Sequence, residues 1–168
     1  EILNFDNLKE KIIKDKFNLR YCGSIYKGRG LELIIDLAKA NQDIRFHIIG
    51  GSKKQVTKIK ETNKNLKNLI LYGHQTYYKS QTMIQTFDLL IAPYQKKVQI
   101  KNGTDTSKWM SPLKIFEYMA SGIPFICSDL EVFNSYLKNK VNCLLVKPNS
   151  VEDWSNSIKV LKNDSIMR

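Results

Sequence analysis

Short apolar runs alternate with amphipathic segments along most of the chain, and this alternation restricts the fold more than any other feature of the sequence. The apolar runs have the length of single strands. In the amphipathic segments, apolar residues recur at intervals of three and four, which is the pattern of one helix face. We therefore expect strands at Phe17–Cys22, Ile44–Ile49, Leu69–Tyr72, Leu89–Ile91, Pro124–Cys127 and Cys143–Val146, and helices from Leu31 through Ala38 and at Ser52–Glu61, Ser80–Thr86, Ser111–Ser121, Leu130–Leu137 and Val151–Leu161.

Strands that alternate with helices of this length are joined by right-handed crossovers, which make neighbouring strands parallel and place helices on both faces of the sheet. The sequence thus predicts an α/β fold of the doubly wound, Rossmann-like class with a mostly parallel six-stranded sheet. The chain has 168 residues, of which 42% are hydrophobic, and this suits one globular domain. Residues 1–16 are mostly polar and are expected to be a helical connector from a missing N-terminal domain, so the domain itself spans 17–168.

The chain is strongly basic, because 27 Lys and Arg against 16 Asp and Glu give a net charge of +11. Such a charge favours anionic partners, whether nucleic acid, an anionic membrane surface or a phosphorylated substrate. Biased composition explains it equally well, since much of the excess is lysine mixed with asparagine and isoleucine. No apolar run approaches the roughly 18 residues of a membrane span. Cys22, Cys127 and Cys143 are widely spaced, which indicates neither a disulfide framework nor a zinc site and favours a reducing compartment.

Ligands of an open parallel sheet bind beyond the carboxyl ends of its strands, so the loops that follow the strands are the candidate sites. The first of these loops, Gly23–Gly30, holds three glycines and two cations, Lys27 and Arg29, directly before a helix. Backbone amides, a helix N-terminus and side-chain charge together suit a phosphate group. The loop matches neither the dinucleotide-binding motif nor the P-loop, so a plain tight turn is the alternative.

A second candidate site lies in Ser111–Gly122, whose serine, proline and final glycine are typical of an N-cap, a first turn and a helix end. Lys114 falls in the first turn, where its charge opposes the helix dipole by about 0.3–1 kcal/mol. A bound anion would remove that conflict. Glu117, one turn later, could accept hydrogen bonds from a sugar diol. The alternative is an ordinary surface ion pair between Lys114 and Glu117.

Two further residues are weaker candidates. His74 follows the third expected strand and could face a nucleobase, although a loop histidine is more often simply exposed. Trp109 is expected to pack beneath the long loop that precedes the second site, with stacking on a ligand as the alternative.

Three stretches, in this order along the chain, resemble one protein family. The family is the glycosyl transferases group 1 family of retaining two-domain (GT-B) glycosyltransferases, and the resemblance is to its C-terminal half, which binds the nucleotide sugar. Tyr21–Gly30 resembles the first strand and glycine turn of that half. Ser111–Pro124 resembles its most specific motif, and Asn142–Pro148 resembles its last strand. The resemblance spans about residues 17–164, which makes 17–168 the donor-binding domain. It implies catalytic roles for Arg29 and Lys114 at the donor diphosphate. The substrate-binding set is then Gly23, Ser24, Gly28, His74, Ser111, Leu113 and Glu117.

The sequence departs from the family pattern at three positions. Ser24 stands where the family often has an arginine, and Arg29 stands where it has a lysine. Of the family's two acidic residues, the second is kept as Glu117, which the resemblance assigns to the ribose hydroxyls. The first falls on Trp109, so the usual contact to the transferred sugar is altered, and Lys114 with the amides near Leu113 is expected to take over part of it.

The resemblance implies transfer of a sugar from a nucleoside diphosphate to a glycan or lipid-linked acceptor, with retention at the anomeric carbon. Cations and helix-end amides would stabilise the charge that grows on the departing diphosphate. We expect no metal and no other cofactor. We expect a cytoplasmic location that extends to the inner face of the membrane, with peripheral contact to anionic lipid. The partner that supplies the acceptor is the N-terminal domain of the same protein, so this chain alone is expected to be inactive.

Two other functions stay open on the sequence alone. A doubly wound sheet serves many nucleotide- and phosphosugar-binding proteins, because a fold does not determine a function. A basic module for nucleic acid or membrane is the second alternative. It has only the net charge in its favour, since the sequence shows no basic stripe with interleaved aromatics. We therefore expect no nucleic-acid partner.

Overall fold

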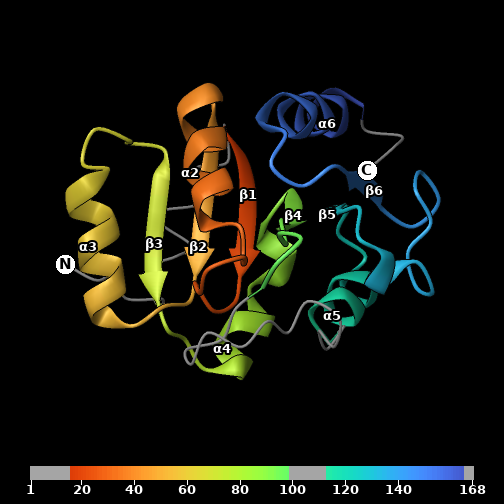
Figure 1. Cartoon of the computed structure of the whole chain (residues 1–168). Helices are drawn as coiled ribbons and strands as arrows, with labels where there is room; N and C mark the ends of the chain where they lie inside the picture. The colour runs from red at the N-terminus through yellow and green to blue at the C-terminus, as the bar shows by residue number, and fades with distance from the viewer. Residues whose placement is uncertain (1–15, 99–112, 165–168) are drawn as a thin grey trace.

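The computed structural model describes residues 16–98 and 113–164, and within them six strands form one sheet (Figure 1). All neighbouring strands are parallel. The strand order is β3-β2-β1-β4-β5-β6. The strands are β1 (Phe17–Cys22), β2 (Ile44–Ile49), β3 (Leu69–Gly73), β4 (Leu89–Ala92), β5 (Phe125–Ser128) and β6 (Leu144–Val146).

The strand order reverses beside β1. The chain adds β2 and then β3 on one side of β1, and returns to pair β4 on the other side. The crevice beyond the carboxyl ends of β1 and β4 is therefore the topological switch point, where doubly wound proteins bind their ligands. The predicted fold class is confirmed.

Helices cover both faces of the sheet. Buried residues of α2, α3 and α6 pack with one face, and those of η2 and α5 pack with the other. The inward positions predicted for the last helix are right, because Trp154, Ile158 and Leu161 are fully or almost fully buried. The helices are α2 (Leu31–Ala40), α3 (Lys53–Thr62), α4 (Tyr77–Thr82), α5 (Leu113–Ser121) and α6 (Val151–Asn163), with 3₁₀ turns η2 (Ile84–Thr86) and η4 (Glu131–Phe133).

The helix expected at Leu130–Leu137 is wrong, because only η4 forms there. Side chains bind the backbone of this segment and compete with helical hydrogen bonds. The Asn142 amide donates to the Tyr136 carbonyl at 2.9 Å and accepts from the Lys138 backbone N–H at 2.8 Å. These bonds fold the segment back on itself instead of extending a helix.

The helix expected at Ser80–Thr86 begins earlier and ends earlier. Thr76 caps it, because its hydroxyl accepts from the Lys79 backbone N–H at 3.4 Å, so α4 starts at Tyr77. The chain then tightens into η2. This shift brings Ser80 into the middle of α4, facing the sheet.

Two expectations lie outside the described residues. The connector expected at residues 1–16 is described only at Lys16, and the cap expected at Ser111 precedes the first described residue of α5. No helix in the described ranges is long and apolar enough to cross a membrane.

Candidate functional site

A cleft of about 290 Å³ lies beyond the carboxyl ends of β1, β2 and β3. It brings together four residues that the sequence predicts for the site, although they lie far apart along the chain: Gly23, Ser24, His74 and Glu117. The other lining residues are Cys22, Ile49, Gly50, Gly51, Gln75, Tyr77, Ser80 and Gln81.

The loop after β1 packs tightly against the segment after β4. Gly30 has φ +85°, and a Cβ atom added to it would lie 2.0 Å from the Pro93 carbonyl oxygen. Gly28 has φ +87°, and its added Cβ would lie 2.0 Å from the Lys97 carbonyl oxygen. Both positions need glycine because any side chain would clash with backbone. Gly28, predicted to contact substrate, thus has a packing role in the structure.

Lys114 is half-buried at the start of α5, and its side chain turns inward towards the loop after β1. Its ammonium group lies 4.3 Å from the ring centre of Tyr21 and 5.2 Å from that of Tyr94. A Cβ atom added to Gly23 would lie 2.6 Å from the same nitrogen, so glycine leaves the space that Lys114 uses. Lys114 therefore reaches the wall of the cleft, and no ion pair joins it to Glu117 in the described structure.

Burial is the main cause that lowers the pKa of Lys114 to about 8, and the nearby charge of Arg29 lowers it further. Cation–π contacts with two tyrosine rings offset only part of the lost hydration. Lys114 forms no salt bridge within residues 16–98 and 113–164, and an anion at this position would supply a countercharge.

Arg29, the other predicted catalytic cation, lies on the same tyrosine. Its guanidinium carbon is 5.3 Å from the ring centre of Tyr94, and its Nε atom is buried without a hydrogen-bond partner. Tyr21 fixes the loop between the two cations, since its hydroxyl donates to the Ser24 carbonyl at 2.7 Å. The structure thus gathers Arg29 and Lys114 around Tyr94, and the role of Tyr21 and Tyr94 could not be predicted from the sequence.

The other predicted residues fall at the margins of this arrangement. His74 is exposed on the cleft rim, and Glu117 is half-buried one turn into α5. The Leu113 side chain is 66% exposed and does not line the cleft. Ser111 and Trp109 lie outside the described residues. Within those residues, no three His, Cys, Asp or Glu side chains form a group that could hold a metal ion.

The sequence model of the glycosyl transferases group 1 family matches residues 4–168. The chain belongs to this family. The resemblance seen in the three sequence stretches is therefore confirmed. No curated protein sequence matches this family member.

Solved structures of glycosyltransferases share the fold of this family member. HepE from Anabaena, in complex with UDP and glucose, is 16% identical with a TM-score of 0.73, over 97% of this chain and 43% of HepE. Sucrose-phosphate synthase from Thermosynechococcus elongatus is 15% identical with a TM-score of 0.74, over 96% of this chain and 40% of the synthase. The catalytic domain of a cholesterol-α-glucosyltransferase from Helicobacter pylori is 16% identical with a TM-score of 0.68, over 89% of this chain and 88% of that domain. This family member thus spans less than half the length of HepE and of the synthase.

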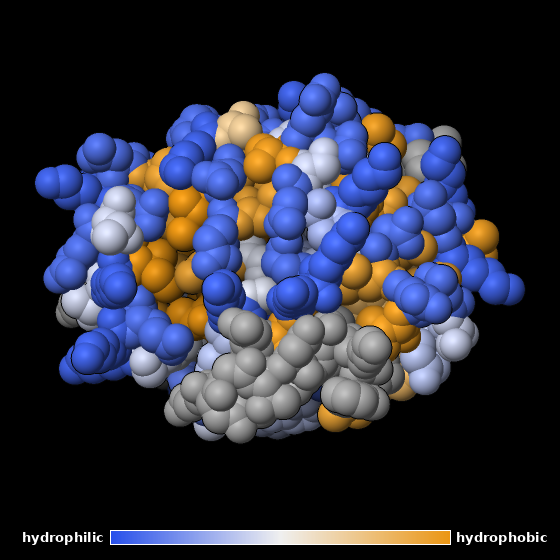
Figure 2. Space-filling view, viewed as in Figure 1, coloured by the Kyte–Doolittle hydropathy of each residue, from blue (hydrophilic) through white to orange (hydrophobic). Residues whose placement is uncertain are grey.

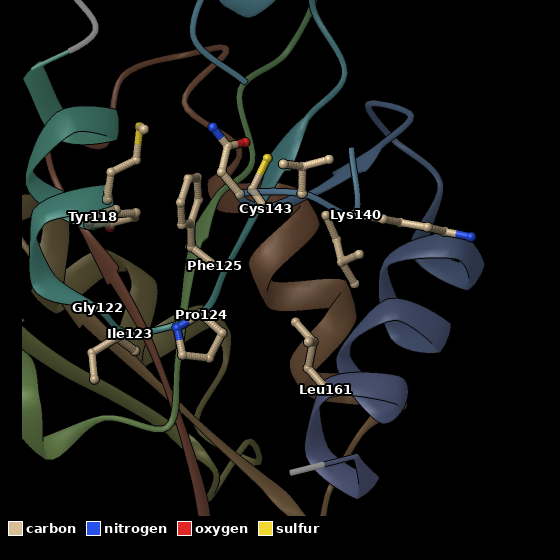
Figure 3. Close-up of a pocket in the computed structure, with 12 residues that line it drawn as sticks. Tyr118, Gly122, Ile123, Pro124, Phe125, Lys140, Cys143 and Leu161 are labelled. Carbon is tan, nitrogen blue, oxygen red and sulfur yellow. The ribbon is translucent and has the colours of Figure 1, made fainter. Parts of the chain in front are cut away.

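A second cavity of about 230 Å³ lies at the opposite end of the sheet in this family member (Figure 3). It is lined by Phe125 at the start of β5, Cys143 before β6 and Leu161 on α6, among others. The Lys140 side chain extends away from Phe125 and Cys143 in this view (Figure 3). Lys140 is the one cation among the described lining residues, whereas Lys114 and Arg29 lie together beside the first cleft, so this cavity is less suited to a diphosphate.

Proposed function

We propose that the chain is the donor-binding half of a retaining glycosyltransferase, which moves a sugar from a nucleoside-diphosphate sugar to a glycan or lipid-linked acceptor. The observation that carries the proposal is the pair of cations around Tyr94. Arg29 and Lys114 meet beside the cleft that Glu117 lines. Structures of HepE with UDP and with UDP-glucose give independent support, because they share this fold.

Each residue has a chemical role in the proposed reaction. The diphosphate would lie against Arg29 and Lys114, whose charges stabilise the negative charge that develops as the sugar leaves. The two ribose hydroxyls would donate to the Glu117 carboxylate. Gly23 and Ser24 would bring backbone close to the phosphates, and His74 would lie at the base. Two cations meet the charge of the diphosphate without a metal ion.

The acceptor and the second wall of the active site belong, in this proposal, to the N-terminal domain of a longer protein. Transfer to an acceptor needs a site closed to water, since water competes as the acceptor. We propose that the chain alone binds the donor and transfers no sugar, because in this proposal it supplies only one wall of the active site.

The lysines of α3 and of the residues that follow it lie where they suit peripheral contact with an anionic membrane. Hydrophilic side chains gather over α3, at the left edge of the view in Figure 2. The segment 53–67 carries one acidic residue, Glu61, whereas the α2 segment 31–43 carries three acidic residues and one lysine. Each lysine near an anionic lipid surface contributes about 1 kcal/mol at physiological salt. The six lysines of the segment are Lys53, Lys54, Lys58, Lys60, Lys64 and Lys67.

Calorimetry of the 168-residue chain in the presence of a chelator tests the proposed function. The titrants are UDP, GDP, ADP and CDP, a single-stranded oligonucleotide, and vesicles of phosphatidylglycerol. We expect at least one nucleoside diphosphate to bind without metal and to compete with its sugar conjugate. Vesicles should bind separately and lose affinity with salt. Salt-dependent binding of the oligonucleotide with no heat from any nucleoside diphosphate would instead favour a basic nucleic-acid module.

A further inference from the structure

A buried arginine lies behind the floor of the cleft and has no countercharge. Arg20 is the fourth residue of β1 and is only 1% exposed. No carboxylate lies within salt-bridge distance of its guanidinium group in residues 16–98 and 113–164. Its Nε and Nη1 atoms have no hydrogen-bond partner, and its guanidinium carbon lies 5.5 Å from the ring centre of Phe87. Burying such a charge destabilises a fold, so a functional reason for it is worth seeking.

Within the described residues, the side-chain hydrogen bond of Arg20 leads to the cleft. Its Nη2 atom donates to the Ser80 hydroxyl at 2.5 Å, and Ser80 lines the cleft although it is only 5% exposed. The Cys22 thiol, which also lines the cleft, lies 3.1 Å from the same oxygen. Ser80 is therefore the point at which the buried charge meets the ligand space.

The arginine determines what Ser80 can offer to a ligand. An arginine N–H can only donate, so the Ser80 oxygen accepts there and keeps its own O–H for another partner. When the Cys22 thiol donates to the second lone pair, Ser80 has no acceptor left. The positive charge also polarises the O–H and strengthens it as a donor. With the Cys22 thiol as the donor of that contact, this part of the floor presents a hydrogen-bond donor and no acceptor.

A neighbouring residue on the cleft wall offers the opposite polarity. The Gln75 side-chain amide donates through Nε2 to the Tyr72 carbonyl at 3.1 Å, which leaves its oxygen available as an acceptor. Ser80 and Gln75 together therefore present one donor and one acceptor to a ligand in the cleft. Uracil and guanine carry the complementary pair, a carbonyl oxygen beside a ring N–H. Cytosine and adenine carry an amino group beside a bare ring nitrogen, which is the reverse.

We infer that Ser80, positioned by Arg20, selects donors whose base has a carbonyl group beside a ring N–H, and that Gln75 completes the selection. The inference rests on the proposed function, because it concerns the base of the same nucleotide sugar. The base would lie between β3 and α4, against Ser80 and Gln75. Ser80 contacts the ligand, whereas Arg20 is a positioning residue that acts through Ser80.

The test compares UDP with CDP by calorimetry, since their bases differ only at this edge. The wild-type chain should bind UDP at least ten-fold more tightly than CDP. Ser80→Ala should weaken binding of UDP about five- to ten-fold and leave binding of CDP nearly unchanged, which reduces the ratio of UDP to CDP affinity. Arg20→Met should also reduce the ratio, because the freed Ser80 oxygen can then accept from the cytosine amino group. This variant should fold at least as stably as the wild type.

Ser155→Ala is the matched control. Ser155 is buried on α6, at the other face of the sheet, and accepts from the Asn41 amide at 2.9 Å. Its loss should lower stability and leave the ratio of UDP to CDP affinity unchanged. Equal binding of UDP and CDP by the wild type, or a ratio that survives Ser80→Ala, would overturn the inference while leaving the proposed function intact. Failure of every nucleoside diphosphate to bind would overturn both.

Discussion

Lys114→Met is expected to weaken binding of UDP about ten- to hundred-fold and, at the same time, to make the empty chain more stable. The loss of affinity follows from removing a charged hydrogen bond to the diphosphate, which is worth about 1.5–3 kcal/mol. The gain in stability follows from removing an ammonium group that is half-buried against Tyr21 and Tyr94 and forms no salt bridge in the part of the chain that the structure describes. Calorimetry and urea denaturation at pH 7 measure the two effects.

The stability effect has a definite pH dependence. The pKa of Lys114 is about 8 in the folded chain and about 10.4 in an unfolded one, so between these values the unfolded chain binds more protons. Stability contributed by this group therefore rises as the pH increases from 8 to about 10.4. The difference between Lys114→Met and the wild type should be roughly 1–3 kcal/mol at pH 7 and should shrink over that range. UDP affinity of the wild type should fall above pH 8, because the neutral amine attracts the diphosphate less.

Lys64→Met is the control for this experiment, since it removes the same charge from an exposed position after α3. It should change both UDP affinity and stability little. Lys114 would not be the diphosphate ligand if Lys114→Met kept wild-type affinity for UDP. The same conclusion would follow if the variant were less stable than the wild type at pH 7, as expected when an ordinary surface ion pair is removed.

Glu117→Ala is expected to weaken binding of UDP about ten- to hundred-fold, because the ribose loses its hydrogen bonds to a carboxylate. The same substitution should barely affect 2′,3′-dideoxyuridine diphosphate, which has no hydroxyls to donate. Calorimetry with both nucleotides on both proteins forms a double cycle that isolates this contact. An equal loss for the two nucleotides would show that Glu117 acts on another part of the ligand.

Most of the sheet could be predicted from the sequence, because its strands are largely buried and most of their residues are apolar. β1 and β2 have the predicted bounds, β3, β4 and β6 differ by one residue at one end, and β5 is shifted by one residue at both ends. The failure at Leu130–Leu137 has a local cause. Side chains such as Asn142 bind the backbone there, and apolar spacing carries no information about such bonds.

Part of the site could be predicted because glycine turns and helix starts leave a local signature. Gly23, Ser24, His74 and Glu117 do line one cleft. The inward turn of Lys114 onto Tyr21 and Tyr94 depends on contacts between distant segments, so sequence spacing could not reveal it.

Arg20 and Ser80 were also missed. The only signal in the sequence is the charged residue Arg20 within the expected strand Phe17–Cys22. A polar residue in a strand usually marks a solvated face, whereas the structure buries Arg20 beneath Phe87 and α4. Ser80 comes sixty positions after Arg20 in the sequence, and only the fold brings the two side chains together.

A crystal structure of the 168-residue chain with UDP tests the central claim most directly. The proposed function predicts the diphosphate against Arg29 and Lys114, the ribose hydroxyls on Glu117, and the base beside His74 in the cleft beyond β1, β2 and β3. UDP bound instead in the cavity between Phe125 and Leu161, or along the lysines of α3, would contradict it.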